Sequence, residues 1–195
     1  MQETLDTAEQ ILDVAQHLVQ TCGYNAFSYA DISAEVGIRK ASIHYYFPSK
    51  GDLGRHLVAR YRETFRKKRE QIDHKTDDSR LKLAQYIQLY LDGLQNERLC
   101  LCGMLAADFN TLPQAVREEV KSFFADNEAW LAKVLTEGSK AGVIRCNGLA
   151  EVEAQLLLAA LQGAMLVARS RGDITQFQAI AQKLLAMLEV KSQTV

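Results

Sequence analysis

The scarcity of proline is the feature that most constrains this chain, because proline interrupts helices more strongly than any other residue. Only Pro48 and Pro113 occur in 195 residues, so long stretches are free of breakers. In the first stretch, apolar residues recur at steps of three and one from Leu5 to Cys22, which places them on one face of a helix that Gly23 ends. No segment alternates with the period of two that is typical of a half-buried strand. The sequence therefore predicts an all-α protein.

Local signals place three further helices in the N-terminal part. Ser28, with Asp31 three positions on, is a capping-box-like start for a second helix, and Gly37 supplies a sharp turn after it. A short third helix is expected at about 39–46. A long fourth helix, with Ser49 as its N-cap, is expected at about 49–72. The two short helices with their glycine turn form a candidate helix-turn-helix.

The polar stretch 73–80 is expected to be a loop and is the best candidate for a domain boundary. It separates an N-terminal three-helix domain at 1–50, with the fourth helix as connector, from a larger helical domain at 75–195. In the larger domain, helical patterns cover about 81–96, 99–109, 113–140, 149–170 and 174–190.

Several classes of protein are disfavoured by what the sequence lacks. The first ten residues are acidic and polar, unlike a secretory signal, and no window offers the roughly 18 uninterrupted apolar residues of a membrane span. The sequence contains no HExxH motif and no glycine-rich phosphate loop, and the spacing of the cysteines does not suit zinc. We therefore expect a cytoplasmic protein with reduced thiols, no enzymatic activity, no metal and no cofactor.

Charge is concentrated near the candidate helix-turn-helix. Residues 36–69 contain ten lysines and arginines against two acidic residues, a net of +8, while the whole chain carries −1. The other residues therefore sum to −9. A basic segment in an otherwise acidic chain indicates a local site for a polyanion such as DNA.

The segment 31–53, DISAEVGIRKASIHYYFPSKGDL, resembles the helix-turn-helix of the TetR/AcrR family of bacterial repressors. The residues that follow the family pattern in order are Gly37, Ile38, Ala41, Ser42, Ile43, Tyr46, Phe47, Ser49 and Lys50. Three positions depart from it: His44 where tyrosine is commonest, Ala41 where glycine is common, and Ser33 where alanine is usual. These departures put the base preference in doubt rather than the fold.

The resemblance implies roles for individual residues in binding a double-stranded, pseudo-palindromic operator. Ser28 would contact a phosphate at the start of the second helix, and Lys50 would hold another at the start of the fourth. The remaining candidates lie on the recognition helix and would reach base edges or backbone: Arg39, Lys40, Ser42, His44 and Tyr45. Ile43 and Phe47 would hold that helix to its neighbours.

The resemblance also implies that the larger domain binds a small-molecule inducer and forms a homodimer. Small residues keep the helix at 149–170 thin, and the next helix carries an apolar stripe, so we expect a four-helix dimer interface within about 149–190; closure of a monomer core is the alternative. Large side chains that could line a ligand pocket, or that could be ordinary core, are Tyr86, Tyr90, Met104, Phe109, Phe123, Phe124, Trp130 and Met165.

Cys100 and Cys102 allow two interpretations. In some members of the family a cysteine near this position senses oxidants or electrophiles, and Arg98 could lower a thiol pKa here. The alternative is that both are small buried residues at a crowded helix start. Residues at i and i+2 do not face each other on a helix, which argues against a disulfide between them.

The function that we expect is that of a ligand-responsive DNA-binding transcriptional regulator, a repressor that an inducer releases from its operator. The alternative is a helical ligand-binding or protein-interaction module whose DNA-binding head has lost its function. The inducer, the operator, the regulated genes and the choice between repressor and activator lie beyond the sequence.

Overall fold

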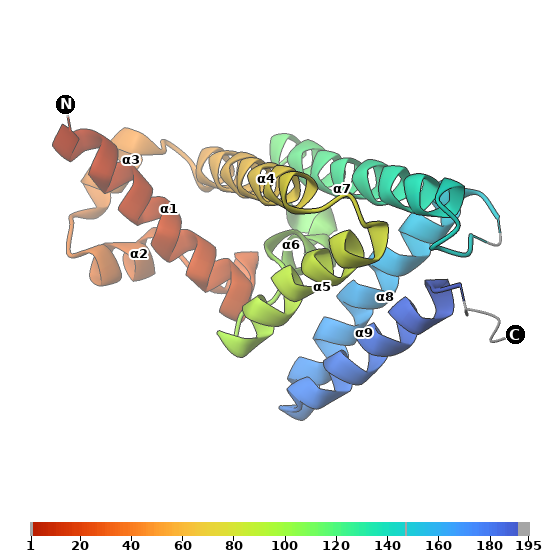
Figure 1. Ribbon diagram of the computed structural model, residues 1–195. Helices are drawn as coiled ribbons and strands as arrows, with labels where there is room; N and C mark the ends of the chain where they lie inside the picture. The colour runs from red at the N-terminus through yellow and green to blue at the C-terminus, as the bar shows by residue number, and fades with distance from the viewer. Residues whose placement is uncertain (1, 147, 191–195) are drawn as a thin grey trace, which may run out of the picture. The chain divides into compact units, whose positions relative to one another are not determined.

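The computed structural model describes residues 2–146 and 148–190, and the regular elements in this part of the chain are helices (Figure 1). One isolated β-bridge, between Ile144 and Glu189, is the exception. The all-α prediction is confirmed. The elements in order are α1 (Gln2–Cys22), η1 (Tyr24–Ala26), α2 (Tyr29–Val36), α3 (Lys40–Tyr46), α4 (Lys50–Lys75), α5 (Ser79–Gln95), α6 (Leu101–Ala107), η2 (Phe109–Thr111), α7 (Gln114–Lys140), α8 (Ala150–Arg171) and α9 (Ile174–Leu188).

The helices form two compact units, and the chain passes between them more than once. Unit 1 contains the residues up to Thr64 together with Arg98–Phe123, and unit 2 contains Phe65–Glu97 together with the residues from Phe124 on. Helices α4 and α7 each contribute residues to both units. Residues 98–123, expected in the larger domain, thus belong to the same unit as the helix-turn-helix, and α6 packs against α1. The division into DNA-binding and ligand-binding domains stays a prediction.

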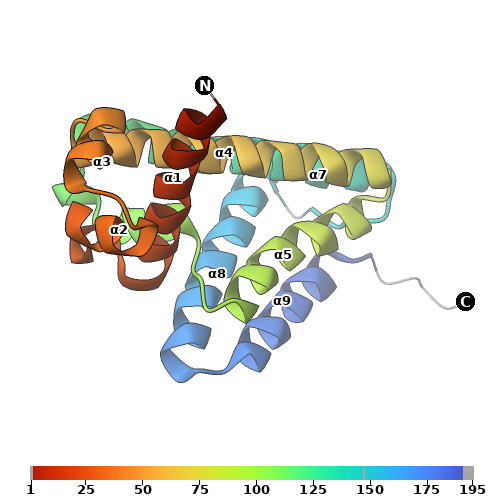
Figure 2. The same cartoon turned by 90° about the vertical axis from the view of Figure 1, so that its left-hand side faces the viewer.

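Unit 1 is built around α1, which packs against η1, α2 and α6 (Figure 2). The apolar stripe predicted for α1 is its buried face, with Ile11, Ala15 and Val19 fully inaccessible to solvent. Gly23 ends the helix with φ 97°, a backbone conformation that glycine adopts without steric cost. Tyr24 then begins η1 as a buried residue.

Unit 2 has α5, α8 and α9 in mutual contact, and α8 and α9 lie side by side as an antiparallel pair (Figure 1). Gly172, in the left-handed conformation with φ 63°, forms the turn between α8 and α9. Leu161 and Phe177, both fully buried, represent the apolar faces that these two helices contribute to the core.

The polar stretch 73–80 is mostly helical, which corrects the loop expected there. Helix α4 continues to Lys75, and α5 begins at Ser79 with Asp78 as its N-cap. The polar residue Asp73 stays within α4 because it has partners: its Oδ2 accepts a hydrogen bond from Trp130 Nε1 at 3.0 Å, and its Oδ1 lies 2.9 Å from Lys82 Nζ. Tertiary contacts of this kind have no local signature in the sequence.

Among the described residues, α8 alone is long and apolar enough to cross a membrane, judged by length and composition only. Core helices of soluble proteins often meet the same criterion. One face of α8 is buried in unit 2, while Val152, Leu156, Leu166 and Val167 on another face are exposed.

Candidate nucleic-acid interface

Helix α2 begins with the capping box that the sequence predicted. The Ser28 hydroxyl accepts a hydrogen bond from the Ala30 N–H at 3.2 Å and donates to Asp31 Oδ2 at 2.8 Å. The Ser28 N–H also donates to Asp31 Oδ2, at 2.7 Å. These bonds from Ser28, the backbone one first, lower the pKa of the Asp31 carboxyl. The start of α2 is therefore capped by its own side chains, and Ser28 and Asp31 are exposed there.

The turn between α2 and α3 is also as predicted. Gly37 has φ 75° and donates its N–H to the Ser33 carbonyl at 3.1 Å. The Ser33 hydroxyl donates to the Ile38 carbonyl at 2.5 Å. The serine that departs from the family pattern thus stabilises the turn, a role that alanine could not fill.

Helix α3 divides cleanly into a buried and an exposed side. Ile43 is fully buried and Phe47, at its end, is 4% exposed, so the predicted anchors are confirmed as buried. Tyr29 on α2 also fixes this end, since its hydroxyl donates to the Phe47 carbonyl at 2.8 Å. On the opposite side, Tyr45 is 78% exposed, a high value for an aromatic side chain.

The other candidate DNA-binding residues of the recognition helix are near Tyr45. Arg39, which is the N-cap of α3, Lys40 and His44 are exposed, and Ser42 is half-buried. The His44 ring packs against the Tyr29 ring with centroids 4.7 Å apart, and its Nδ1 lies 3.1 Å from the Pro48 carbonyl oxygen. These contacts hold the imidazole in one orientation.

Lys50, the phosphate contact expected at the start of α4, lies against the connection between α1 and α2. Its Nζ donates a hydrogen bond to the Phe27 carbonyl and lies over two aromatic rings, 4.1 Å from the centroid of Phe27 and 4.8 Å from that of Tyr24. Burial lowers the pKa of this ammonium, and the negative charge of Asp108 opposes the effect. Sequence reasoning missed Tyr24 and Phe27; two aromatic residues in the short connection between helices were the available signal.

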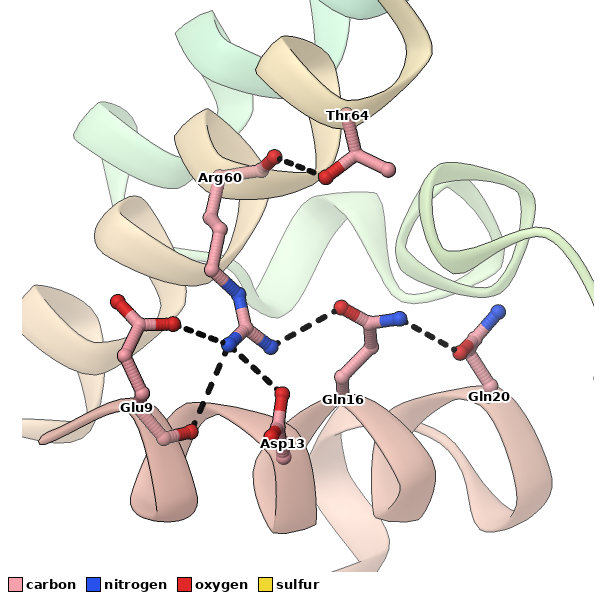
Figure 3. A network of polar contacts seen from close by, with 6 residues as sticks. All are labelled: Glu9, Asp13, Gln16, Gln20, Arg60 and Thr64. Atoms are coloured by element: carbon pink, nitrogen blue, oxygen red, sulfur yellow. Dashed lines mark hydrogen bonds and ion pairs between the residues drawn. The ribbon is translucent and has the colours of Figure 1, made fainter. Parts of the chain in front are cut away.

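Part of the basic segment is neutralised within unit 1. Arg60 Nη1 lies 2.8 Å from both Glu9 Oε2 and Asp13 Oδ1, and its Nη2 donates to Gln16 Oε1 at 3.2 Å (Figure 3). Arg62 Nη1 pairs with Glu119 Oε2 at 2.6 Å. These cations stabilise contacts of α4 with α1 and α7, so the net charge of the segment overstates the charge available to DNA.

The first turns of α4 closely approach η1, the start of α7 and Pro113, which directly precedes α7. A Cβ atom built on Gly51 would lie 3.1 Å from Pro113 Cγ, and one built on Gly54 would lie 3.1 Å from both Tyr24 Cε2 and Val116 Cγ2. The small residues of α4 are therefore required for this approach. The start of α7 supports the segment that follows the recognition helix.

The candidate ligand-binding residues fall into two groups. Tyr86, Tyr90 and Trp130 come together in unit 2: the Tyr86 ring lies 5.4 Å from each of the other two. Met165 is buried in the same unit and Phe124 is half-buried. The other three candidates belong to unit 1: Met104, Phe109 and Phe123. There the Phe123 ring packs on Tyr61, and the Arg117 guanidinium lies over the Phe109 ring.

The group in unit 2 has a polar centre that the sequence did not reveal. The Tyr86 hydroxyl lies 2.9 Å from the Tyr90 hydroxyl and donates to Asn127 Oδ1 at 2.9 Å. Asn127 and Tyr86 are both fully buried. Surface pockets of about 170 and 260 Å³ in unit 2 have other linings: the first lies between α8 and α9, the second between α4 and α5.

Both cysteines of the candidate redox pair are buried and unbridged. The Tyr61 hydroxyl donates to Cys100 Sγ at 3.9 Å. Burial, followed by the proximity of Cys100, raises the pKa of the Cys102 thiol well above its ordinary value, which Arg62 opposes. A raised pKa favours the thiol of Cys102 over the reactive thiolate, which agrees with the interpretation as a small buried residue.

The chain is similar to known families and proteins with a helix-turn-helix. The family model described as "Bacterial regulatory proteins, tetR family" matches residues 11–57, and one described as "Tetracyclin repressor-like, C-terminal domain" matches residues 80–184. A curated relative, the HTH-type transcriptional repressor DhaR of Mycobacterium sp. (strain GP1), is 28% identical over 84% of this chain and 88% of its own.

Solved structures give closer matches. A TetR-family transcriptional regulator from Agrobacterium tumefaciens is 36% identical, with a TM-score of 0.93 over 96% of this chain and 100% of its own. A TetR transcriptional regulator from Legionella pneumophila is 30% identical, with a TM-score of 0.85 over 93% of this chain and 96% of its own.

Proposed function

Because this chain belongs to the TetR family of bacterial transcriptional regulators, we propose that it is a homodimeric repressor that leaves its operator when a small molecule binds. The observation that carries the proposal is the two-sided helix α3. Buried Ile43 fixes it to the fold, and its exposed side presents cationic, polar and aromatic groups. Such a surface suits the major groove.

The DNA contacts that we propose follow from exposure and position. Arg39 and Lys40, at the exposed start of α3, would meet phosphates and base edges. Ser42 and His44 would contact base edges, and the exposed Tyr45 ring would pack against a thymine methyl or the sugar backbone. At the start of α2, the backbone N–H groups beside Ser28 would bind a phosphate, while its hydroxyl remains the helix cap.

The dimer that we propose uses the exposed apolar face of α8 with α9, within about residues 149–190. An exposed apolar stripe on this face is formed by Val152, Leu156 and Leu166. In a single chain this stripe contacts water, and pairing with a second copy would bury it. Gly163 lies in the same face with open space around its Cα, which allows a partner helix to approach closely. The shallow pocket of about 170 Å³, lined in part by Leu156 and Met187, could receive an apolar side chain of the second copy.

For the inducer, we propose the aromatic cluster of Tyr86, Tyr90 and Trp130 as one wall of the site, with Phe124 and Met165 as further candidates. The Tyr86 and Asn127 side chains would supply polar groups for an oriented ligand. Met104 and Phe109 remain candidates from the sequence alone. No metal, cofactor or enzymatic activity is part of the proposal, and we place the protein in the cytoplasm.

The mechanism that we propose is a shift between two populations. Two recognition helices in a dimer must fit half-sites about one DNA turn, or a multiple of it, apart. Ligand binding would displace α4 and change this spacing, which lowers the affinity for the operator. By linkage, the operator must weaken ligand binding by the same factor.

Fluorescence anisotropy tests the proposal with a labelled duplex from immediately upstream of the gene and an unrelated duplex of equal length. We expect specific binding that saturates at two chains per duplex and weakens steeply as salt rises. Equal, weak binding to both would call for selection from random genomic fragments. Failure there too would favour the alternative, a ligand-binding or interaction module without functional DNA binding.

A further inference from the structure

Both the side chain and the backbone of Lys50 contact the segment that connects α1 and α2. Its Nζ donates to the Phe27 carbonyl and lies over the Phe27 and Tyr24 rings. The backbone carbonyl of Lys50 in turn accepts a hydrogen bond from the Tyr24 hydroxyl at 2.8 Å. Both ends of the residue are therefore bound to the same short segment, and we call Tyr24, Phe27 and the Phe27 carbonyl the lysine cage.

The cage is a rigid part of unit 1. Tyr24 is 4% exposed and Phe27 5%, and the two rings meet edge to face with centroids 6.1 Å apart. Gly54, one turn into α4, is glycine where any side chain would press on the Tyr24 ring. A cation between two such rings is held by the negative charge of the ring faces as well as by the hydrogen bond.

The Phe27 carbonyl links the cage to the start of α2. Phe27 directly precedes Ser28, the N-cap of α2, and it has extended backbone with φ −122°. A hydrogen bond to its carbonyl fixes the direction in which the chain enters α2. Lys50 itself is the first residue of α4. Through this one side chain, the start of α4 is fastened to the start of α2.

An ammonium engaged in this way is poorly available to DNA. The Phe27 carbonyl takes one of the three N–H donors of the ammonium, and moving to a phosphate outside the cage would cost this bond and both ring contacts. Arg39 and Lys40 are exposed and face no such cost. Burial also lowers the pKa of Lys50, in agreement with an ammonium that is partly removed from water.

We propose that Lys50 is a positioning residue of the DNA-binding head, which orients the start of α2 for the operator and makes no phosphate contact of its own. This proposal concerns how the DNA-binding function is carried out and rests on that function. It reverses the role that the family resemblance implied for this lysine.

Salt dependence distinguishes the two roles. The anisotropy titration is repeated at several salt concentrations for the wild type, Lys50→Met and, as matched control, Lys40→Met. Loss of one phosphate contact in each chain removes two contacts from the dimer, so the slope of log affinity against log salt becomes shallower by about 1.8, at about 0.9 per contact. We expect that change for Lys40→Met. For Lys50→Met we expect an unchanged slope and an affinity for the specific duplex that is about five- to tenfold weaker.

A conservative substitution, Lys50→Arg, should restore the affinity for the operator. In Lys50→Arg the guanidinium can also donate to the Phe27 carbonyl and stack on the two rings, so the affinity of this variant should recover most of the loss. A general loss of folding would instead lower the melting temperature and weaken binding to both duplexes alike. Circular dichroism on the same samples separates that outcome.

A measurement on the wild type needs no variant. The protein is treated briefly with an amine-acetylating reagent, with and without the specific duplex, and each lysine is quantified by mass spectrometry. We expect Lys40 to react quickly and to become protected by DNA, and Lys50 to react slowly in both samples. The reaction of the free protein tests the cage even if no operator has been found, so failure of the proposed function is recognised separately.

Three results would overturn the proposal. One is a slope for Lys50→Met that becomes shallower by about 1.8, because the ammonium of each chain would then contact a phosphate in the complex. Another is full operator affinity in Lys50→Met, which would make the cage dispensable. The third is acetylation of Lys50 in the free protein as fast as that of Lys40.

Discussion

Gln20 and Leu99 lie 79 positions apart in the sequence and exchange two hydrogen bonds. The Gln20 side-chain Nε2 donates to the Leu99 carbonyl at 2.7 Å, and the Leu99 N–H donates to the Gln20 carbonyl at 3.2 Å. The Gln20 Oε1 accepts a bond from Gln16 Nε2, and Gln16 is bound to Arg60 (Figure 3). A continuous polar chain thus joins α4, the last turn of α1 and the segment leading into α6.

The first prediction concerns the buried pair of hydrogen bonds between Gln20 and Leu99. Gln20 is 6% exposed, so Gln20→Leu keeps the volume and leaves the Leu99 carbonyl without its side-chain donor. We expect a loss of about 1–3 kcal/mol in unfolding free energy. Thermal denaturation should show a melting temperature lower by about 2–4 °C for each kcal/mol. Gln95→Ala, at an exposed position, is the control and should stay within about 0.5 kcal/mol of the wild type. A melting temperature of Gln20→Leu equal to that of the control would show that this pair of hydrogen bonds carries no stability.

Local chemistry explains which features could be predicted from the sequence. Ser28 with Asp31, Gly37, and Ser49 with Asp52 act on backbone groups within three or four positions, so their pattern is visible in the order of the residues. In each case the structure has the cap or turn that was expected. The apolar stripe of α1 belongs to the same class, because helical periodicity alone places it on one face.

Choices of long-range partner could not be predicted in this way. Arg60 and Lys50 count equally in a net charge, yet one forms ion pairs with α1 and the other enters an aromatic cage. The candidate pocket residues show the same limit: Tyr86 and Trp130 meet in unit 2, whereas Met104 belongs to unit 1. Apolar character favours burial but does not identify the neighbours of a residue.

The second prediction concerns acid stability. Burial acts to raise the pKa of the Asp73 carboxyl, but hydrogen bonds from Lys82 and Trp130 outweigh it and leave the pKa below its ordinary value. A carboxyl with a depressed folded-state pKa stabilises the fold above its unfolded pKa, about 3.9, and this contribution disappears as the pH falls through the folded value. Asp73→Asn should therefore cost about 1–3 kcal/mol at pH near 7, because the buried Lys82 loses its nearest partner.

Urea denaturation of the wild type and Asp73→Asn across a pH series measures this effect. The gap between them should be constant at neutral pH and should shrink below about pH 4. The exposed Asp77 acts on Lys82 through charge at longer range, so Asp77→Asn is the control and should give a smaller gap. A gap for Asp73→Asn that persists unchanged in acid would contradict the assigned ion pair.

The third prediction tests the two interpretations of the cysteines. Cys22 is exposed, whereas Cys100 and Cys102 are 4% and 0% exposed. Because Cys102 also has a raised pKa, it carries little thiolate at neutral pH. Timed labelling with N-ethylmaleimide should modify Cys22 first and Cys102 last, as followed by mass spectrometry. Labelling of Cys100 or Cys102 as fast as Cys22, together with reduced affinity for DNA, would support the redox hypothesis instead.

The fourth prediction tests the dimer with a matched pair of substitutions. Leu156 on α8 is 56% exposed and Leu81 on α5 is 53% exposed, so glutamate at either position is solvated in a single chain. If α8 and α9 pair with a second copy, Leu156→Glu places an unpaired carboxylate in an apolar interface, at a cost of several kcal/mol. Leu81→Glu has no such consequence.

Analytical ultracentrifugation should therefore find Leu156→Glu as a monomer that keeps its helical circular dichroism, and Leu81→Glu as a dimer. A single head binds one half-site, so the affinity of the monomer for the operator should fall by a factor of at least about 100, because the second contact is no longer intramolecular. Loss of DNA binding with the dimer intact would mean that residue 156 acts on the head by another route. A dimeric Leu156→Glu with full affinity would exclude this face of α8 from the interface, and its exposed apolar side chains would need a different partner.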